Sequence, residues 1–588
     1  MAQLQFKGKT FVQNHHLLVK YHELVPVKAK SLTDKVSLHD NLIIHGDNLK
    51  ALKALLPLYA GKVDCIYIDP PYNTGNECWA YNDNVSSPMM QEWFGKDVDR
   101  EDLTRHDKWL CMMTPRLKLL KDMLKTEGVI MVSIDDNEAH HFRCLMNEVF
   151  GEDNFVAQLV WEKGRKNDAK LFSVGHEYIL IYARSMEALK LRNTIWREEK
   201  PGAKEIQYEY LRLRGTHGKD NDAVQTALRE FYKQLPKNHP SKKHSRYGNV
   251  DDNGVWRDDN MSWPGGGGPT YDVPHPKTRK PCAVPEGGWR YATIDKMNEM
   301  IAAGVVVFRE NHTEPPIRKT YLVRSLSPES NGNNDEDDSS DIGIQVAGSY
   351  FYRSALQATN VLVGIFGKKL FENPKDHEVI TRLIRYVTQG NPTALVLDSF
   401  AGTATTGHAV LSLNKADKGS RRFILVECED YADSITAERV RRVIKGVPTA
   451  KDEALKAGLG GSFSFFKLGK PLELESILEG DSLPTYEELA RYVFYTATGE
   501  EFNDKAIAEK KHFIGESRNY QVFLFYEPDV AKLKNMALTL DMAKSLPALK
   551  KDKRRLVFAP TKYLDQEHLD QYRIDFAQLP FEIYELTR

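Results

Sequence analysis

The sequence predicts an α/β protein whose sheet is mainly parallel and covered by helices on both faces. Short apolar runs alternate with helical patterns in the first 185 residues, and the same alternation returns near residue 394. Such alternation is typical of βαβ units, in which a helix connects two parallel strands. Between about residues 186 and 349 the alternation stops, and Gly, Pro, Trp and basic residues become frequent. We therefore predict one α/β domain that is interrupted by an insertion.

The predicted strands are short apolar runs, and the predicted helices are longer segments between them. The first part of the chain has strands at 41–45, 63–68, 129–134 and 177–182, with helices at 48–59 and 108–126. After the insertion come strands at 394–398 and 422–427, a helix at 432–445 and a late strand at 520–526. We expect the strands before and after the insertion to share one sheet.

The length of 588 residues allows roughly three to four domains. Shifts in composition divide the chain into two core parts at 1–185 and 350–458, an insertion at 186–349, and a C-terminal α+β domain at 459–588. Inside the insertion, the acidic segment 327–341 is expected to be disordered, because it lacks the apolar residues that form a core.

The composition limits the classes of partner. The net charge is −1, so a nucleic acid would have to bind a local basic surface. The six cysteines are scattered without a Cys/His cluster, which favours reduced core residues and predicts no metal site. Because no apolar run approaches the roughly 18 residues that span a bilayer, and no signal peptide is recognisable, we expect a cytoplasmic protein without a membrane partner.

The tetrapeptide Asp69-Pro70-Pro71-Tyr72 follows the apolar strand at 63–68. Prolines remove backbone donors, so the Asp69 carboxylate and the Pro70 carbonyl are left as acceptors for the two hydrogens of an NH2 group. Tyr72 offers a ring on which a flat base can stack. These features favour a site for a flipped-out base. The structural alternative is a Pro-Pro turn whose Asp69 caps the next helix.

A second motif begins where the strand at 394–398 ends. Asp398, Phe400, Gly402 and Thr405 belong to a turn of small residues that leads into a helix, whose N-terminus can approach a bound anion closely. Glu427 ends the next strand, where an acid can accept hydrogen bonds from ribose hydroxyls. Without a full glycine signature or a phosphate-binding lysine, this turn favours a nucleoside without phosphate.

Asp47 also ends a predicted strand and is a candidate acceptor for an adenine amino group. The alternative for Asp47 is a helix N-cap, and the alternative for Glu427 is a solvated strand end.

These motifs, in this order along the chain, resemble the β class of DNA amino-methyltransferases, which use S-adenosylmethionine. The resemblance implies a Rossmann-like core with a permuted, mainly parallel seven-stranded sheet, and a target-recognition domain in the insertion. It also implies that Phe371, Asn373 and Lys375 embrace the methionine end of the cofactor, that Asp69 and Asp398 lie at the cofactor site, and that residues 176–178 lie near the target base.

Residues 277–282, 287–290 and 495–499 resemble segments of the modification subunits of type III restriction-modification systems. This resemblance implies double-stranded DNA as substrate, a homodimer, and a helicase-nuclease restriction subunit as partner, since this sequence has no P-loop motif of its own. One residue departs from the family pattern. Ala404 stands where a second glycine is usual, and at positive φ its methyl group would cost roughly 1–2 kcal/mol.

The activity implied is direct methylation of adenine N6 in DNA, with Asp69 and Pro70 orienting the amine, Pro71 stiffening the turn, and Tyr72 stacking on the base. Basic residues of the insertion are candidates for phosphate contacts: Lys242, Lys243, Arg246, Lys277, Arg279 and Lys280. Three alternatives stay open: methylation of cytosine N4, a DNA-recognition subunit that serves a separate helicase-nuclease, and methylation of RNA.

Overall fold

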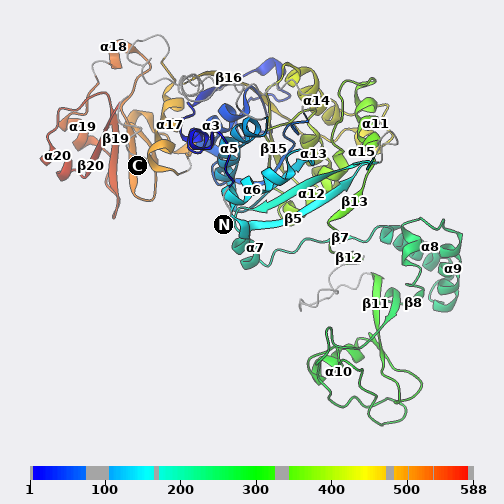
Figure 1. The fold of residues 1–588 in the computed structure, drawn as a ribbon. Coiled ribbons are helices and arrows are strands. Elements are labelled where there is room, and N and C mark those ends of the chain that lie inside the picture. Colours follow the sequence, from blue (N-terminus) through cyan, green and yellow to red (C-terminus); the bar gives the residue numbers. More distant parts are fainter. Residues whose placement is uncertain are drawn as a thin grey trace. The chain divides into compact units, whose positions relative to one another are not determined.

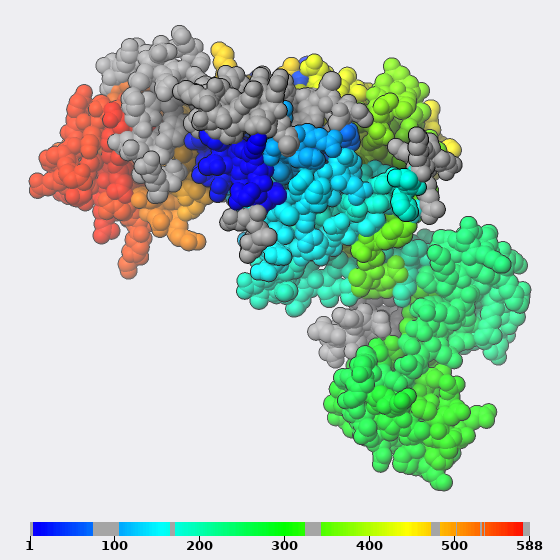
Figure 2. All heavy atoms as spheres, viewed as in Figure 1, coloured from blue at the N-terminus to red at the C-terminus, as the bar shows by residue number. Residues whose placement is uncertain are grey.

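The computed structural model describes residues 4–74, 105–164, 171–324, 343–471, 483–500, 502–533 and 536–579. The chain forms two compact units (Figures 1 and 2). Unit 1 contains residues 1–194 and 348–588, and unit 2 contains residues 195–347. The segment 327–341, predicted to be disordered, lies outside the described residues.

Unit 1 is built on one large sheet, which has ten strands among the described residues. In spatial order they are β1 (His22–Pro26), β16 (Ser464–Pro471), β2 (Leu42–His45), β15 (Arg422–Glu427), β14 (Leu395–Asp398), β3 (Val63–Ile68), β4 (Leu124–Ile134), β6 (His176–Ala183), β5 (Phe155–Glu162) and β13 (Tyr350–Tyr352).

The sheet is mainly parallel, as predicted. All neighbouring pairs from β16 to β4 run parallel, β6 is antiparallel to both β4 and β5, and β13 is parallel to β5. The family resemblance implies seven strands. The described sheet is larger than that, because β1 and β16 extend one edge and β13 extends the other. Strands from both sides of the insertion share the sheet, which confirms that expectation.

One face of the sheet carries the helices α3 (Asn48–Tyr59), α5 (Arg105–Met123) and α6 (Ala139–Phe150). Their apolar residues form one buried cluster with alternate residues of the strands, such as Ile66 and Ile68 of β3. α3 has the predicted bounds. α5 was predicted to reach residue 126 but ends at Met123, because residues 124–128 extend β4 and pair with β3 at Val63.

The other face carries α12 (His377–Thr388), α13 (Thr405–Asp417) and α14 (Glu438–Lys445). Gly407 of α13 brings this helix close to the sheet, since a Cβ there would lie 3.0 Å from Leu425 and 3.4 Å from Val440 of α14.

The helix predicted at 432–445 is α-helical only from Glu438. Before it, a 3₁₀ turn (Asp430–Ala432) and a π-helical turn (Asp433–Ala437) widen the backbone. This widening places Thr436, whose hydroxyl donates to the Gly402 carbonyl over 2.6 Å.

The C-terminal region of unit 1 is mixed α and β, coloured orange to red in Figure 1. Its described part has α17 (Tyr486–Thr498) and a sheet of β17 (Phe513–Glu516), β18 (Tyr520–Leu524), β19 (Arg554–Ala559) and β20 (Ile574–Gln578). α17 packs against α3, and Phe502 N–H donates to the Pro57 carbonyl. Within the described ranges, no helix is both long and apolar enough to cross a membrane.

Unit 2 contains the helices α8 (Ala203–His217), α9 (Asn221–Gln234) and α10 (Ile294–Ala302). It also has a small antiparallel sheet with the order β10 (Val306–Val307), β11 (Ile317–Arg324), β9 (Gly254–Asp259) and β8 (Asn249–Asp251). One apolar cluster of unit 2 includes Trp289, which is fully buried and donates its indole N–H to the Tyr271 carbonyl. Trp289 is therefore a core residue in this structure.

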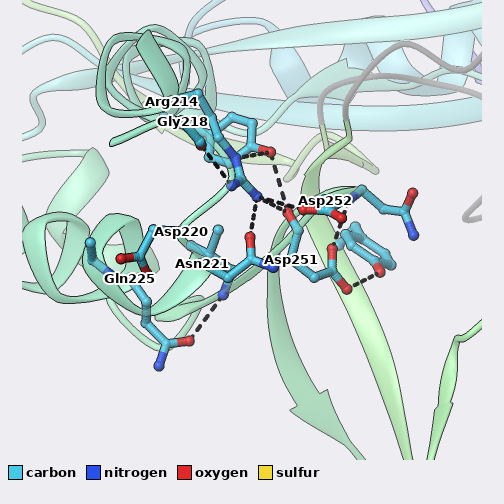
Figure 3. A network of polar contacts seen from close by, with 12 residues as sticks. Arg214, Gly218, Asp220, Asn221, Gln225, Asp251 and Asp252 are labelled. Atoms are coloured by element: carbon cyan, nitrogen blue, oxygen red, sulfur yellow. Dashed lines mark hydrogen bonds and ion pairs between the residues drawn. The ribbon is translucent and has the colours of Figure 1, made fainter. Parts of the chain in front are cut away.

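A polar network around Arg214 holds the parts of unit 2 together (Figure 3). The guanidinium donates to Tyr210 on its own helix, to the Gly218 carbonyl and Asn221 at the start of α9, and to the Asp251 carbonyl of the β8–β9 hairpin. One side chain therefore connects both helices to the sheet.

We expect Arg214→Ala to loosen this connection. The lost hydrogen bonds should cost about 2 kcal/mol, so amide hydrogen exchange in α8 and the β8–β9 hairpin of the full chain should become roughly 30-fold faster. The matched control is Arg212→Ala on the same helix. Arg212 is exposed to solvent, so the loss of its pair with Glu209 should change the exchange little. Equal exchange in the two variants would contradict the role of the network.

Candidate active site

Three parallel strands of unit 1 end at the same edge of the sheet. Asp69 follows β3, while Asp398 ends β14 and Glu427 ends β15. The central strand β14 pairs with β3 on one side and with β15 on the other. The three acidic side chains therefore lie around one cavity of about 440 Å³.

The cavity brings together most of the predicted site residues. Its lining includes Asp69, Pro71, Phe371, Asn373, Lys375, Asp398, Phe400, Gly402, Thr405 and Glu427. Pro70, Tyr72 and Asp47 are not part of the lining. The binding roles of all these residues stay predictions.

Asp47 caps helix α3, which is the structural alternative stated for it. Its carboxylate accepts from the Lys50 N–H over 3.0 Å and lies 3.4 Å from the Arg116 guanidinium. Arg116 is fully buried and also donates to Asn48 over 2.6 Å. These contacts fix Asp47 at the start of the helix.

The turn from Asp398 to Thr405 is held by its own acid. Asp398 accepts from the Phe400 N–H over 3.0 Å and from the Thr406 hydroxyl over 2.6 Å. Burial raises the pKa of Asp398 to about 7. Gly402 and Ala404 both have left-handed backbones, with φ of 50° and 59°. Ala404 therefore meets the condition under which its methyl group carries a conformational cost.

Glu427 ties the same turn to the neighbouring strand. One of its carboxylate oxygens accepts from the Gly402 N–H over 2.7 Å, and the other accepts from the Glu429 N–H over 3.0 Å. Burial raises its pKa to about 7, although these backbone hydrogen bonds act in the opposite direction. The Cys428 N–H also acts on this carboxylate, and the lone pairs that remain can accept from a ligand.

Aromatic side chains line the cavity beside Glu427. Phe371 and Tyr431 meet edge to face, with ring centroids 5.8 Å apart, and Phe400 lines the cavity as well. Tyr431 was not predicted, because it belongs to the irregular turn after β15 and to no recognised motif.

The tetrapeptide is anchored from both sides. Buried Trp109 of α5 donates its indole N–H to the Pro71 carbonyl over 2.7 Å. The Tyr72 hydroxyl accepts from Lys375 over 2.6 Å and donates to Glu177 over 3.1 Å. Burial, together with the negative charges of Asp69 and Glu177, raises the pKa of Tyr72 well above its ordinary value, so the hydroxyl keeps its proton.

A buried arginine that was not predicted supports the turn. Arg439 of α14 donates to the Thr403 carbonyl over 3.2 Å and to the hydroxyls of Thr403 and Thr405 over 2.9 Å each. Burial lowers its pKa to about 9. Arg439 also contacts His408, whose ring stacks on His377 at 4.4 Å. His408 is thus a packed structural residue.

Next to the tetrapeptide, the fold gathers His106, Glu138 and His141, whose ligand atoms lie within 4.8 Å of one another. Their spacing along the chain shows no metal motif, and none was predicted. Glu138 accepts from His106 over 2.6 Å and from the amide of Asn73, the residue that follows Tyr72. These contacts hold the backbone just after the tetrapeptide.

The family of DNA methylases that includes N6 and N4 enzymes matches residues 63–438. The match spans strands on both sides of the insertion and includes Asp69, Gly402 and Glu427. The chain belongs to this DNA methylase family.

Individual relatives are similar over most of this chain. The Mod subunit of the type III restriction-modification enzyme EcoP15I from Escherichia coli is 30% identical over 73% of this chain and 64% of that protein. The StyLTI Mod subunit from Salmonella typhimurium is 29% identical over 80% and 67%. The type II methyltransferase M.KpnI from Klebsiella pneumoniae is 30% identical over 70% and 85%. The matches thus span about two thirds of the two Mod subunits.

The left-handed turn can be tested with glycine replacements. Gly402→Ala should lower the free energy of unfolding by about 1 kcal/mol, because alanine is strained at this φ. Gly364→Ala, within helix α11 (Ala355–Phe366) and with open space around it, should instead raise the stability by roughly 0.5–1 kcal/mol. Thermal unfolding of the full chain measures both. Stabilisation by both variants would contradict the left-handed geometry.

Proposed function

We propose that this protein transfers a methyl group from S-adenosylmethionine to the N6 amine of adenine in DNA. The observation that carries the proposal is the shared cavity, which is lined by Asp69 of the amine-binding tetrapeptide and by Glu427 beside the glycine turn. Membership of the DNA methylase family supports the reaction class, and the names of the relatives support DNA as the substrate. Asp in the first position of the tetrapeptide favours adenine N6 over cytosine N4.

The residues of the cavity fit S-adenosylmethionine. Its volume of about 440 Å³ lies within the range of small-molecule sites. Phe371, Phe400 and Tyr431 offer apolar surface for the adenine ring, and Glu427 has lone pairs for the ribose hydroxyls. The N-terminus of α13 has no capping side chain, so its positive end can attract the carboxylate of the cofactor. The cofactor supplies the methyl group on a sulfonium cation, so no covalent enzyme intermediate is required.

One side chain and one backbone carbonyl of the tetrapeptide orient the target amine. Asp69 and the Pro70 carbonyl each accept one amine hydrogen, which leaves the nitrogen lone pair free to point toward the cavity. Trp109 and Lys375 hold the tetrapeptide in place, so the rate comes mainly from positioning. The proton that the amine loses after methylation passes to the Asp69 carboxylate or to water.

The proposed setting is the cytoplasm, with double-stranded DNA bound by the insertion and a homodimer as the active form. The similarity to Mod subunits favours a helicase-nuclease restriction subunit as partner. A solitary methyltransferase is the second candidate, favoured by the longer share of M.KpnI that is matched. Purified protein that methylates DNA without another subunit is expected in both cases.

Replacement of the key carboxylate tests the reaction. Asp69→Ala should lower the rate of methyl transfer to DNA at least about 10²- to 10³-fold, because the amine loses its oriented acceptor. Labelled S-adenosylmethionine, with mass spectrometry of the nucleosides, should show N6-methyladenine for the unaltered protein.

Glu372→Gln is the control for this experiment. Its side chain is 87% exposed in the segment that lines the cavity, so activity should be retained. Methylated cytosine, labelled RNA in place of DNA, or full activity of Asp69→Ala would overturn the proposal.

The raised pKa of Glu427 predicts a pH dependence. The carboxylate accepts ribose hydrogen bonds and the carboxylic acid does so poorly, so the Kd for S-adenosylmethionine should fall about tenfold between pH 6 and pH 8. The same group should stabilise the cofactor-free fold less as the pH rises from about 4.5 to about 7, since the folded state binds the proton more tightly.

Calorimetric titration across this pH range measures the effect. Glu427→Gln should bind the cofactor more weakly and lose the pH dependence. If the variant keeps the same dependence, Asp398, whose pKa is also about 7, is the group that titrates and the assignment to Glu427 is wrong.

A further inference from the structure

Four charged side chains form a cluster of ion pairs at the amine-binding tetrapeptide: Asp69, Lys163, Glu177 and Lys375. The Lys375 ammonium lies 2.9 Å from Asp69 Oδ1 and 3.2 Å from Glu177 Oε2, and the Lys163 ammonium lies 2.6 Å from Glu177 Oε2. Two cations and two anions balance, which is what a largely buried charged cluster requires. Lys375 and Glu177 are the most buried members, with side chains 8% and 5% exposed.

The Lys375 ammonium has three polar neighbours. It donates to the Tyr72 hydroxyl over 2.6 Å and to Glu177 over 3.2 Å, and it forms an ion pair with Asp69. The ammonium also lies 4.7 Å from the centre of the Tyr72 ring, within range of a cation–π contact. Although burial lowers the pKa of Lys375, Asp69 and Glu177 raise it by more, and Lys375 stays charged. The position of Lys375 is thus set by Glu177 together with Asp69 and Tyr72, the two side chains that are proposed to receive the base.

These contacts give the two carboxylate oxygens of Asp69 different surroundings. Oδ1 is buried and lies against Lys375, while the side chain as a whole is 27% exposed and lines the cavity. A carboxylate held through one oxygen cannot rotate freely, so the other oxygen keeps one direction. This is the condition for orienting an amine.

Glu177 occupies the centre of the cluster but does not line the cavity. It lies in β6 opposite Trp161 of β5, and this pairing brings Lys163, two residues further along the chain, onto its carboxylate. The same Oε2 accepts from Tyr72 and from Lys375. Lys375 and Lys163 lower the pKa of Glu177 against the opposite effect of burial, so it remains an anion.

We propose that Glu177 is a positioning residue for methyl transfer, which holds Lys375 and Tyr72 and, through Lys375, fixes the carboxylate of Asp69 toward the target amine. This inference rests on the proposed function, since it assigns a role to residues behind the same site. Because Glu177 does not line the cavity, its loss should slow the chemical step and leave cofactor binding intact.

The test is Glu177→Gln in the full chain, which keeps the shape and removes the charge. We expect kcat for methyl transfer to plasmid DNA to fall about 10²-fold, with the Kd for S-adenosylmethionine changed by less than about twofold. In Lys375→Met, the acid limb of kcat against pH should move to higher pH, because the carboxylates lose their cation. A residue that only stabilises the fold would not move this limb.

The matched control is Glu162→Gln in the same β5–β6 hairpin, where the carboxylate contacts Tyr350 and lies outside the cluster. It should keep the unaltered kcat. If Glu177→Gln melts below the assay temperature, Glu177→Asp, which keeps the charge with a shorter reach, is judged by the same criteria.

Two results would overturn the inference: equal kcat in the Glu177 and Glu162 variants, or a loss confined to cofactor affinity. Failure of the unaltered protein to methylate DNA would instead refute the proposed function, so the two failures can be told apart.

Discussion

The parallel pairing of β14 with both β3 and β15 is the constraint on which the site depends. Leu397 lies opposite Ile66 on one side and Ile424 on the other, so Asp69 and Glu427, each three residues further along its strand, reach the same edge of the sheet. Asp69 and Glu427 are far apart in the sequence, yet this register makes them two walls of one cavity. The tetrapeptide, the glycine turn and the ion cluster behind them keep their geometry only while this pairing is intact.

Much of the fold could be predicted because its central strands carry a local signal. β2, β3 and β15 are short apolar runs buried on both faces, and α3 lies between two of them, so composition alone marks their ends. The edge strands could not be predicted in this way. β13 and β16 become strands by pairing with β5 and β2, and that pairing depends on distant sequence. The same holds for the π-helical turn before α14, which serves a contact with Gly402.

The residues of the site also divide into those that a local sequence motif marks and those whose position depends on distant parts of the chain. Asp69, Gly402 and Glu427 lie at or just after the carboxyl ends of strands. Open α/β sheets bind their ligands at these ends, so the sequence alone indicates a binding role for the three residues. Tyr431 and Arg439 have no such motif, because their positions depend on how the turn after β15 and helix α14 fold back onto the sheet. For Asp47 the reverse holds. The sequence shows that it follows a strand, but its carboxylate caps helix α3 through the Lys50 N–H and pairs with Arg116.

The order of strands in the sheet has a consequence for biosynthesis. A ribosome delivers β2, β3 and β4 first, then the whole of unit 2, and only afterwards β14 and β15, which lie between β2 and β3. Until those two arrive, the early strands face a gap in the middle of the sheet and their apolar surface has no neighbour. The middle of the sheet can therefore close only after residue 427 has been made, and until then the unpaired strand edges of the emerging chain are prone to aggregation.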